Sequence, residues 1–200
     1  MVCSFFILAL PLSHARLSIL TNIKEYEPTL IPKSKLCMKD EKTVTSVAAG
    51  GLHSACLHRD GSVSTWGAND ENALGRGDVD DDDTHLIKSM LRSESGEIMK
   101  DVIQISAGDN HTTILDIYGK VHVAGMYKDM DSGKWRDLTN LQDTKIKGNH
   151  KFPSEVLGLG GRVIMMDAGN SWNAALREDG ATLYTWGMGN SGQLARSKSM

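Results

Sequence analysis

A segment of just over twenty residues occurs three times in this chain, and it constrains the fold more than any other feature. The copies span residues 47–67, 105–125 and 166–187. The first glycine of each copy stands at positions 50, 108 and 169, so the repeat period is 58 and then 61 residues. A supersecondary unit repeated at such a period predicts a propeller or another repeat array rather than a chain with one central core.

Each copy has the local pattern of a β-hairpin. A turn glycine follows the first glycine by 11 residues, and in two copies it is preceded by aspartate, as in Asp60-Gly61 and Asp179-Gly180. Asp-Gly between alternating apolar residues is a strong hairpin signal, because glycine adopts positive φ without strain. The paired glycines are Gly50 and Gly61, Gly108 and Gly119, and Gly169 and Gly180. Each copy therefore predicts a strand, a tight turn and a second strand, as in one blade of a propeller.

Other positions recur at fixed places in the copies. His53 and His111 correspond to each other, and Trp172 stands at this position in the third copy. We interpret both histidines as structural groups that bond backbone atoms within their own blade, because buried polar groups are nearly always hydrogen-bonded. Catalysis or metal binding is the alternative role. The strand ends carry the remaining repeated residues, Trp66, Gly67, Gly125, Trp186 and Gly187, which we expect to serve packing and turns.

These residues resemble the repeats of the regulator of chromosome condensation family. That family's pattern is Ala-Gly-x-x-His-Ser/Thr-x-x-Leu, then Asp-Gly-x-Val, then Trp-Gly and a tail of the form Asn-x-x-Gly-Gln-Leu-Gly. The resemblance covers about residues 44–200, and its tail is visible at 69–75 and 190–194. It implies an all-β fold, a partial β-propeller with about three blades of the family's seven. Three copies leave sheet edges open, so we expect a fragment or truncated product of a longer propeller.

The expected domain boundaries follow the repeats. Repeat 1 covers residues 44–100, repeat 2 covers 101–161 with a wedge-like insertion, and repeat 3 covers 162–200. Residues 22–43 are predicted to be the tail of a preceding repeat. Residues 1–21 form an apolar segment that is too short to span a bilayer and lacks a preceding basic residue. Residues 1–21 are interpreted either as a secretory signal or as an unstructured start. The resemblance favours a protein of the nucleus or the cytoplasm.

Composition excludes several functional classes. The net charge of −3 does not suggest strong attraction to nucleic acid. The sparse cysteines Cys3, Cys37 and Cys56 have neither metal-ligand nor disulfide spacing, which fits a reducing compartment. The sequence contains neither a phosphate-binding glycine loop nor a paired nucleophile and base. We therefore expect no catalytic residue, cofactor, metal, membrane partner or small-molecule substrate.

The second copy differs from the others after Gly125. Its tail is replaced by a segment rich in charged residues, and this segment is similar to that of the exchange factors for the small GTPase Ran. In that branch of the family the resemblance implies a protruding β-wedge that acts on the GTPase. The expected GTPase-binding residues are Asp109, matched by its repeat position, and the wedge residues Tyr127, Lys128, Asp129, Asp131 and Ser132.

The resemblance thus implies a guanine-nucleotide exchange factor-like fragment that binds a Ran-type small GTPase. Such a factor makes no covalent bond and binds the nucleotide-free GTPase more tightly than the loaded one. Chromatin is a further partner of that branch, although the basic tail that would contact DNA is missing here. The alternative function is a non-catalytic interaction scaffold built of the same repeats, which would have no reason to keep a wedge.

Overall fold

The structure is a computed structural model that describes residues 28, 30–31, 43–69, 71–77, 87–89, 96–128, 135–136 and 151–195. The chain divides into two units, residues 1–32 and 33–200, and the strands of the described residues all lie in the second. The described segments hold no helix that is both long and apolar enough to cross a membrane.

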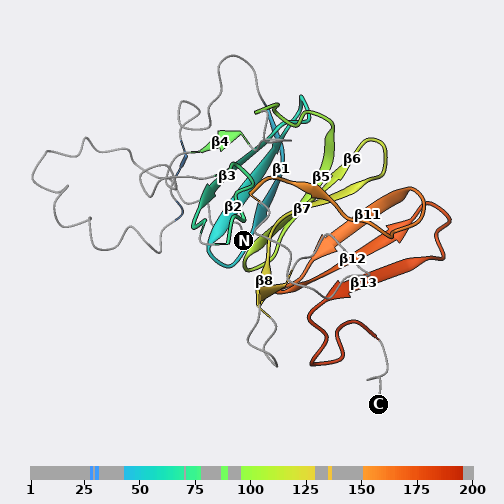
Figure 1. The fold of residues 1–200 in the computed structure, drawn as a ribbon. Coiled ribbons are helices and arrows are strands. Elements are labelled where there is room, and N and C mark those ends of the chain that lie inside the picture. Colours follow the sequence, from blue (N-terminus) through green and yellow to red (C-terminus); the bar gives the residue numbers. More distant parts are fainter. Residues whose placement is uncertain are drawn as a thin grey trace, which may run out of the picture. The chain divides into compact units, whose positions relative to one another are not determined.

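Three antiparallel sheets follow one another along the chain (Figure 1). The first sheet contains β1 (Val44–Ala49), β2 (His53–His58), β3 (Val63–Gly67) and β4 (Lys88–Ser89). The second has the order β10-β7-β6-β5 and contains β5 (Val102–Ala107), β6 (His111–Asp116), β7 (Val121–Gly125) and β10 (Ser154–Glu155). The third contains β11 (Val163–Ala168), β12 (Trp172–Arg177) and β13 (Leu183–Gly187).

The sheets share one register, which shows that each repeat folds in the same way. Leu57 pairs with Val63, Leu115 with Val121, and Leu176 with Leu183 across the second and third strands. Each first strand has an irregularity near its start, at Val44/Ser46, Val102/Gln104 and Val163/Met165. The third repeat has one more residue in the turn between its second and third strands. The pairing of the two strands keeps the same register in spite of this extra residue.

The hydrophobic core lies between neighbouring sheets rather than within one of them. One buried cluster joins Val63 of the first sheet to Val102 and Ile105 of the second. Another joins Val121 of the second sheet to Val163 and Met166 of the third. Each such side chain contributes about 1.5–3 kcal/mol when it leaves water. A single sheet therefore cannot bury its apolar face alone, and stacking on the next sheet stabilises both.

The turn glycines are required by this stacking as well as by their φ angles. Gly61 and Gly119 have φ of +76° and +79°. A Cβ added at Gly61 would lie 1.8 Å from the Lys100 carbonyl oxygen, and one at Gly119 would lie 2.2 Å from Cγ of Arg162. Lys100 and Arg162 precede the first strand of the following sheet, so the absence of a side chain lets the next sheet approach closely.

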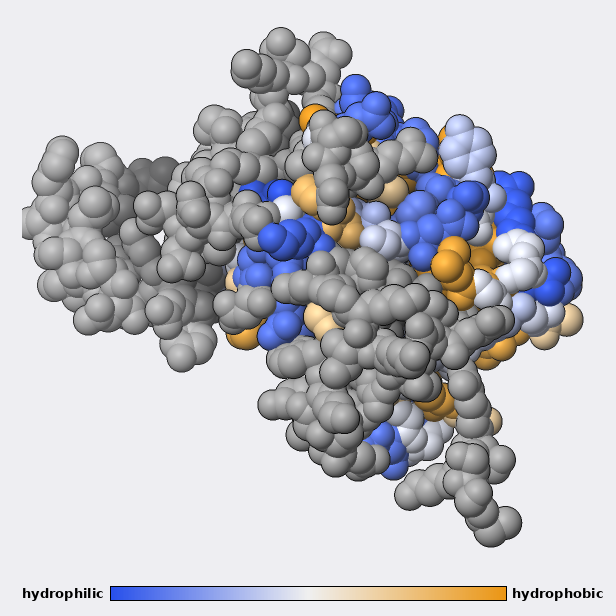
Figure 2. All heavy atoms as spheres, in the orientation of Figure 1, coloured by the Kyte–Doolittle hydropathy of each residue, from blue (hydrophilic) through white to orange (hydrophobic). Residues whose placement is uncertain are grey.

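The predicted all-β class and the partial propeller of about three blades are confirmed. Cys56 lies in β2, where its thiol is buried and forms no disulfide. Burial raises the pKa of its thiol, which makes it inert. On the described surface, Figure 2 shows orange hydrophobic atoms among blue hydrophilic ones. Several large apolar side chains of the described residues are exposed, among them Val47, Ile103 and Leu183.

Candidate functional site

The loops between the first and second strands of the three blades meet at one end of the sheets. The Gly51 amide donates to the Gly108 carbonyl at 3.2 Å, and the Asp109 amide donates to the Asn170 carbonyl at 2.8 Å. The loops are thus joined in sequence, from blade 1 to blade 2 and from blade 2 to blade 3. The cleft between these loops is lined mainly by glycine and alanine, and its polar side chains are those of Asp109 and Asn170.

Asp109 is the acidic residue of a shallow cleft in this row. The cleft is lined by small residues of all three loops together with Asn170. The Asp109 carboxylate accepts a hydrogen bond from the Asn170 side-chain amide, and a Cβ at Gly51 would lie 3.0 Å from its Oδ1. The carboxylate is therefore held between blades 1 and 3 while remaining partly exposed. It is positioned for an external cation or hydrogen-bond donor.

The segment that is expected to form the wedge begins at the same end of blade 2. The Met126 amide donates to the Asn110 carbonyl at 3.1 Å, and Asn110 follows Asp109 directly. After Met126, β8 (Tyr127–Lys128) pairs antiparallel with β9 (Trp135–Arg136) in a two-stranded sheet of its own. Only the backbone of these two strands is described. The expected wedge residues Asp129, Asp131 and Ser132 lie outside the described residues.

The repeated histidines correct one expectation, because they bond the next blade and not their own. Nε2 of His53 lies 2.9 Å from Oγ1 of Thr112, whose hydroxyl donates to the Ala73 carbonyl at 2.7 Å. A hydroxyl has one hydrogen to donate, so the His53 Nε2 must carry the proton of this bond. Nε2 of His111 lies 3.2 Å from Oδ1 of Asn173. Each histidine therefore joins two blades.

Burial keeps both imidazoles neutral at physiological pH. It lowers the pKa of His111 from 6.5 to about 4, although the hydrogen bond with Asn173 acts in the opposite direction. Burial likewise lowers the pKa of His53, against the backbone and charge of Asp109. No group of three or more His, Cys, Asp or Glu within the described segments is placed to hold a metal ion. The two histidines are thus suited to holding blades together.

The third blade uses tryptophan where the others use histidine. A Cβ at Gly108 would lie 2.1 Å from Cε1 of His111, and one at Gly169 would lie 2.2 Å from Nε1 of Trp172. The indole therefore covers its glycine as the imidazole does, and the third blade keeps this contact. Such ring contacts also involve Gly50, which faces His53.

The remaining repeated residues lie at strand ends. Gly67, Gly125 and Gly187 have φ of +106°, +93° and +111°. At each of them a Cβ would come within 2.3–2.6 Å of a carbonyl oxygen of the loop that precedes the second strand. Trp186 is buried in the core between blades 2 and 3, and Trp66 is half-buried.

Sequence reasoning missed the residues that receive the histidine bonds. Thr112 and Asn173 each follow the repeated aromatic position, and Ser54 occupies the same place in the first copy. A polar residue repeated at this position could have indicated the hydrogen bonds between blades. A buried hydrogen bond was also missed: Nε2 of His122 lies 2.9 Å from Oδ2 of Asp116, whose Oδ1 accepts the amides of Tyr118 and Lys120 in the turn. The equivalent positions of the first copy hold His58 and Ser64, whose Nε2 and Oγ lie 2.7 Å apart.

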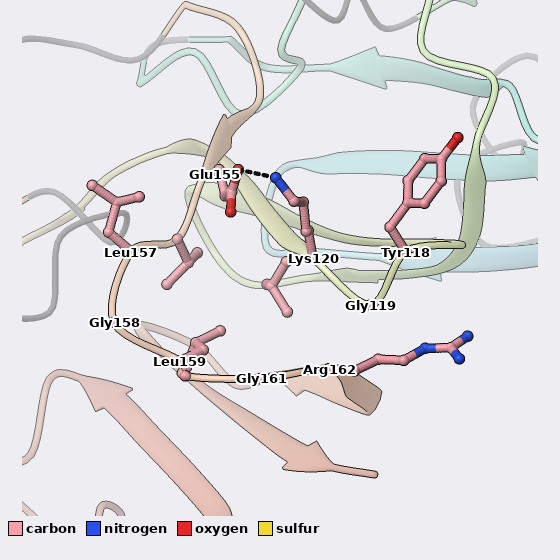
Figure 3. A pocket seen from close by; sticks show the side chains of 12 residues that line it. Tyr118, Gly119, Lys120, Glu155, Leu157, Gly158, Leu159, Gly161 and Arg162 are labelled. Atoms are coloured by element: carbon pink, nitrogen blue, oxygen red, sulfur yellow. Dashed lines mark hydrogen bonds and ion pairs between the residues drawn. The ribbon is translucent and has the colours of Figure 1, made fainter.

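A second cleft lies at the opposite end of blades 2 and 3. Figure 3 shows Lys120 and Glu155 facing each other above a chain segment that includes Gly158 and Gly161. Nζ of Lys120 lies 2.9 Å from Oε2 of Glu155, so these opposite charges neutralise each other. The six residues of β6 separate this cleft from Asp109 by about 17–20 Å. Its charges do not converge on a ligand, and we do not assign it a function.

Comparison with known families agrees with the repeat pattern. Two models described as regulator of chromosome condensation (RCC1) repeat match residues 60–115 and 44–73. Together they cover the first blade and the beginning of the second, where the sequence keeps most of the pattern.

Several curated proteins are similar to this chain. The regulator of chromosome condensation of Xenopus laevis is 37% identical over 153 residues, which are 76% of this chain and 32% of that protein. The guanine nucleotide exchange factor SRM1 of Saccharomyces cerevisiae is 27% identical, over 79% of this chain and 36% of that protein. Human HERC3, a probable E3 ubiquitin-protein ligase, is 30% identical, over 76% and 13% respectively. The chain spans about a third of the length of the first of these relatives.

Solved structures agree on the fold. The crystal structure of Prp20p from Saccharomyces cerevisiae, described with its binding to Gsp1p and histones, superposes with a TM-score of 0.61. It covers 78% of this chain and 35% of that protein, at 24% identity. An identity this low is evidence for the fold alone.

Proposed function

Since this chain belongs to the regulator of chromosome condensation repeat family, we propose that it acts as a guanine-nucleotide exchange factor-like module. Its partner is a small GTPase of the Ran type. The binding surface is the blade end that carries Asp109 and the β8–β9 segment. We call this end of the blades the loop end.

One geometric observation carries the proposal. Asp109 lies close to the start of the β8–β9 segment. The carbonyl of Asn110, the residue after Asp109, accepts a hydrogen bond from the amide of Met126, the residue before β8. One partner can therefore contact both the partly exposed Asp109 carboxylate and the two-stranded β8–β9 extension. The loops beneath them are tied to blades 1 and 3 by backbone hydrogen bonds, so the surface is pre-organised and loses little entropy on binding.

The proposed mechanism requires no covalent chemistry. A protein that binds the nucleotide-free GTPase more tightly than the GDP-bound form weakens nucleotide binding by the same factor, because the two affinities are linked. Asp109 would pair with a basic or amide group of the GTPase. Lys128, Asp129 and Asp131 supply charges of both signs in the wedge, where they would compete with groups that hold the nucleotide and its metal ion.

The test is release of fluorescent GDP from Ran, measured with the full 200-residue chain. We expect faster release with the wild-type chain and loss of most of the acceleration in the double variant Lys128→Ala/Asp129→Ala and in Asp109→Ala. Lys120→Ala is the matched control, because it removes a charge at the opposite end of the same blade. Folded wild-type protein that leaves release unchanged would refute exchange activity, and an equal loss in Lys120→Ala would refute the assignment to the loop end.

An interaction scaffold is the second candidate, favoured by the similarity to a probable E3 ubiquitin-protein ligase. A scaffold would bind its partner without accelerating nucleotide release. Histone binding, described for the yeast relative, extends the proposal to a chromatin partner and to the nucleus. A pull-down with purified histones, in parallel with the release assay, separates the chromatin partner from the GTPase.

A further inference from the structure

The residue after the first glycine of each copy differs among the three blades, although the glycine itself recurs. It is Gly51 in blade 1, Asp109 in blade 2 and Asn170 in blade 3. The three residues are neighbours at the loop end, because backbone hydrogen bonds join the loops that contain them. The common fold of the blades does not require this difference, so its reason lies in the contacts between the loops.

Asn170 supplies a hydrogen-bond donor to the Asp109 carboxylate. Its side-chain amide donates to Oδ2 of Asp109, and its carbonyl accepts the Asp109 backbone amide at 2.8 Å. An ionised carboxylate only accepts hydrogen bonds, so the NH₂ group of Asn170 must face it. Within the described part of the chain, the carboxylate accepts no other hydrogen bond, and its Oδ1 is left for an external donor.

Ser171 fixes the direction of the Asn170 amide. The Ser171 hydroxyl donates to Oδ1 of Asn170 at 2.6 Å, and Ser171 is only 7% exposed. A flip of the amide would place its oxygen against the carboxylate, and two acceptors cannot bond each other. Ser171 therefore donates to Asn170, and Asn170 donates to Asp109, in one ordered chain of hydrogen bonds.

Gly51 of blade 1 completes the surroundings of the carboxylate. A Cβ at Gly51 would lie 3.0 Å from Oδ1 and 3.2 Å from Cγ of Asp109. A side chain at this position would crowd the oxygen that Asn170 leaves open. The three equivalent positions thus have three different tasks: glycine leaves space, aspartate carries the charge, and asparagine holds it.

We propose that Asn170 and Ser171 are positioning residues for Asp109. They hold its carboxylate in one rotamer, with Oδ2 bound inside the chain and Oδ1 available to the GTPase. This role rests on the proposed function, because it needs a partner at the loop end. The third blade thereby contributes to a binding site whose charge lies on the second.

The size of the effect follows from the rotamers of aspartate. A side chain that is not held distributes among three staggered χ1 wells. If these wells become equally populated, the form that is competent to bind falls to about one third. The apparent dissociation constant then rises about threefold.

The first test needs no GTPase. Three-bond couplings from the backbone nitrogen and carbonyl carbon to Cγ report the χ1 rotamer of Asp109 in NMR spectra of the full chain. We expect one rotamer in the wild type, averaged couplings in Asn170→Ala and a smaller departure in Ser171→Ala. Asn190→Ala, which changes an exposed asparagine of the same blade, is the matched control and should keep the wild-type couplings. Wild-type couplings in Asn170→Ala or averaged couplings in the wild type would overturn the positioning role, and unchanged couplings in Ser171→Ala would remove Ser171 from it.

The second test measures affinity for nucleotide-free Ran. Asn170→Ala should raise the dissociation constant about threefold. In the Asp109→Ala background the same substitution should have no effect, because no carboxylate is left to position. Circular dichroism checks that each variant is folded.

The two tests separate the positioning role from the proposed function. Direct contact of Asn170 with the GTPase, or a general loss of structure, would weaken binding equally in both backgrounds and would overturn the positioning role. A wild-type chain that does not bind Ran would refute the proposed function, and the NMR couplings would still decide whether Asn170 holds Asp109.

Discussion

Acid should destabilise this protein through His111. The imidazole is fully buried, its Nε2 bonds Asn173 of the next blade, and its pKa is lowered from 6.5 to about 4. Between these two values the unfolded chain binds a proton that the folded chain excludes. Unfolding therefore takes up a proton, and stability must fall as the pH falls through this range. The stabilisation is fully present above about pH 6.5 and is lost as the pH approaches 4.

The size of the effect follows from the two pKa values. Each pH unit between them corresponds to about 1.4 kcal/mol, so the loss at low pH has a ceiling of about 3 kcal/mol. Between pH 7 and pH 5 the loss attributable to His111 is about 2 kcal/mol. This is a large share of the 5–15 kcal/mol that is typical of a domain.

Urea unfolding followed by tryptophan fluorescence at pH 7 and pH 5 measures this loss. The His111→Gln variant lacks the titrating group, so it should lose about 2 kcal/mol less than the wild type over this range. Other titrating residues, including His53, contribute to both proteins and largely cancel in the difference. Equal losses in the two proteins would refute the reasoning, because His111 would then titrate alike in the folded and unfolded chains.

Three further substitutions test the interfaces between blades. Gly180→Ala, at φ +66°, should lower the free energy of unfolding by about 1–2 kcal/mol through backbone strain alone. Gly61→Ala, at φ +76°, should lower it by at least about 2 kcal/mol more, because its Cβ also meets the Lys100 carbonyl of the next blade. Similar urea midpoints for the two variants would contradict this expectation. Gln104→Ala removes two hydrogen bonds to the Met166 backbone, of 2.6 and 3.1 Å, and should lower the free energy of unfolding by about 2 kcal/mol, whereas no change would mean that water replaces the amide without loss.

The repeat made the fold predictable because each copy carries its own turn and strand signals. Glycine at positions 61, 119 and 180 indicated the hairpins, and all three adopt positive φ. Stacking could be expected from the repeat alone, since a blade cannot bury its apolar face without a neighbour.

The partners of the histidines could not be predicted in the same way. His53 and Thr112 are 59 residues apart, and only the contact between blades brings them together. A repeat pattern shows which positions are equivalent but does not show whether a side chain points within its blade or across to the next. The placement of Asp109 beside Asn170 depends on the same contact. The binding role of all the expected wedge residues remains a prediction from the sequence.

The most direct test of the central claim compares the affinity of this chain for Ran in its nucleotide-free and GDP-bound forms. Exchange activity predicts tighter binding of the nucleotide-free form, and the ratio of the two dissociation constants sets the greatest weakening of GDP binding. Asp109→Ala should reduce this ratio, while Lys120→Ala should leave it unchanged. Equal affinity for both forms would contradict the account, because a protein that does not distinguish them cannot promote nucleotide release.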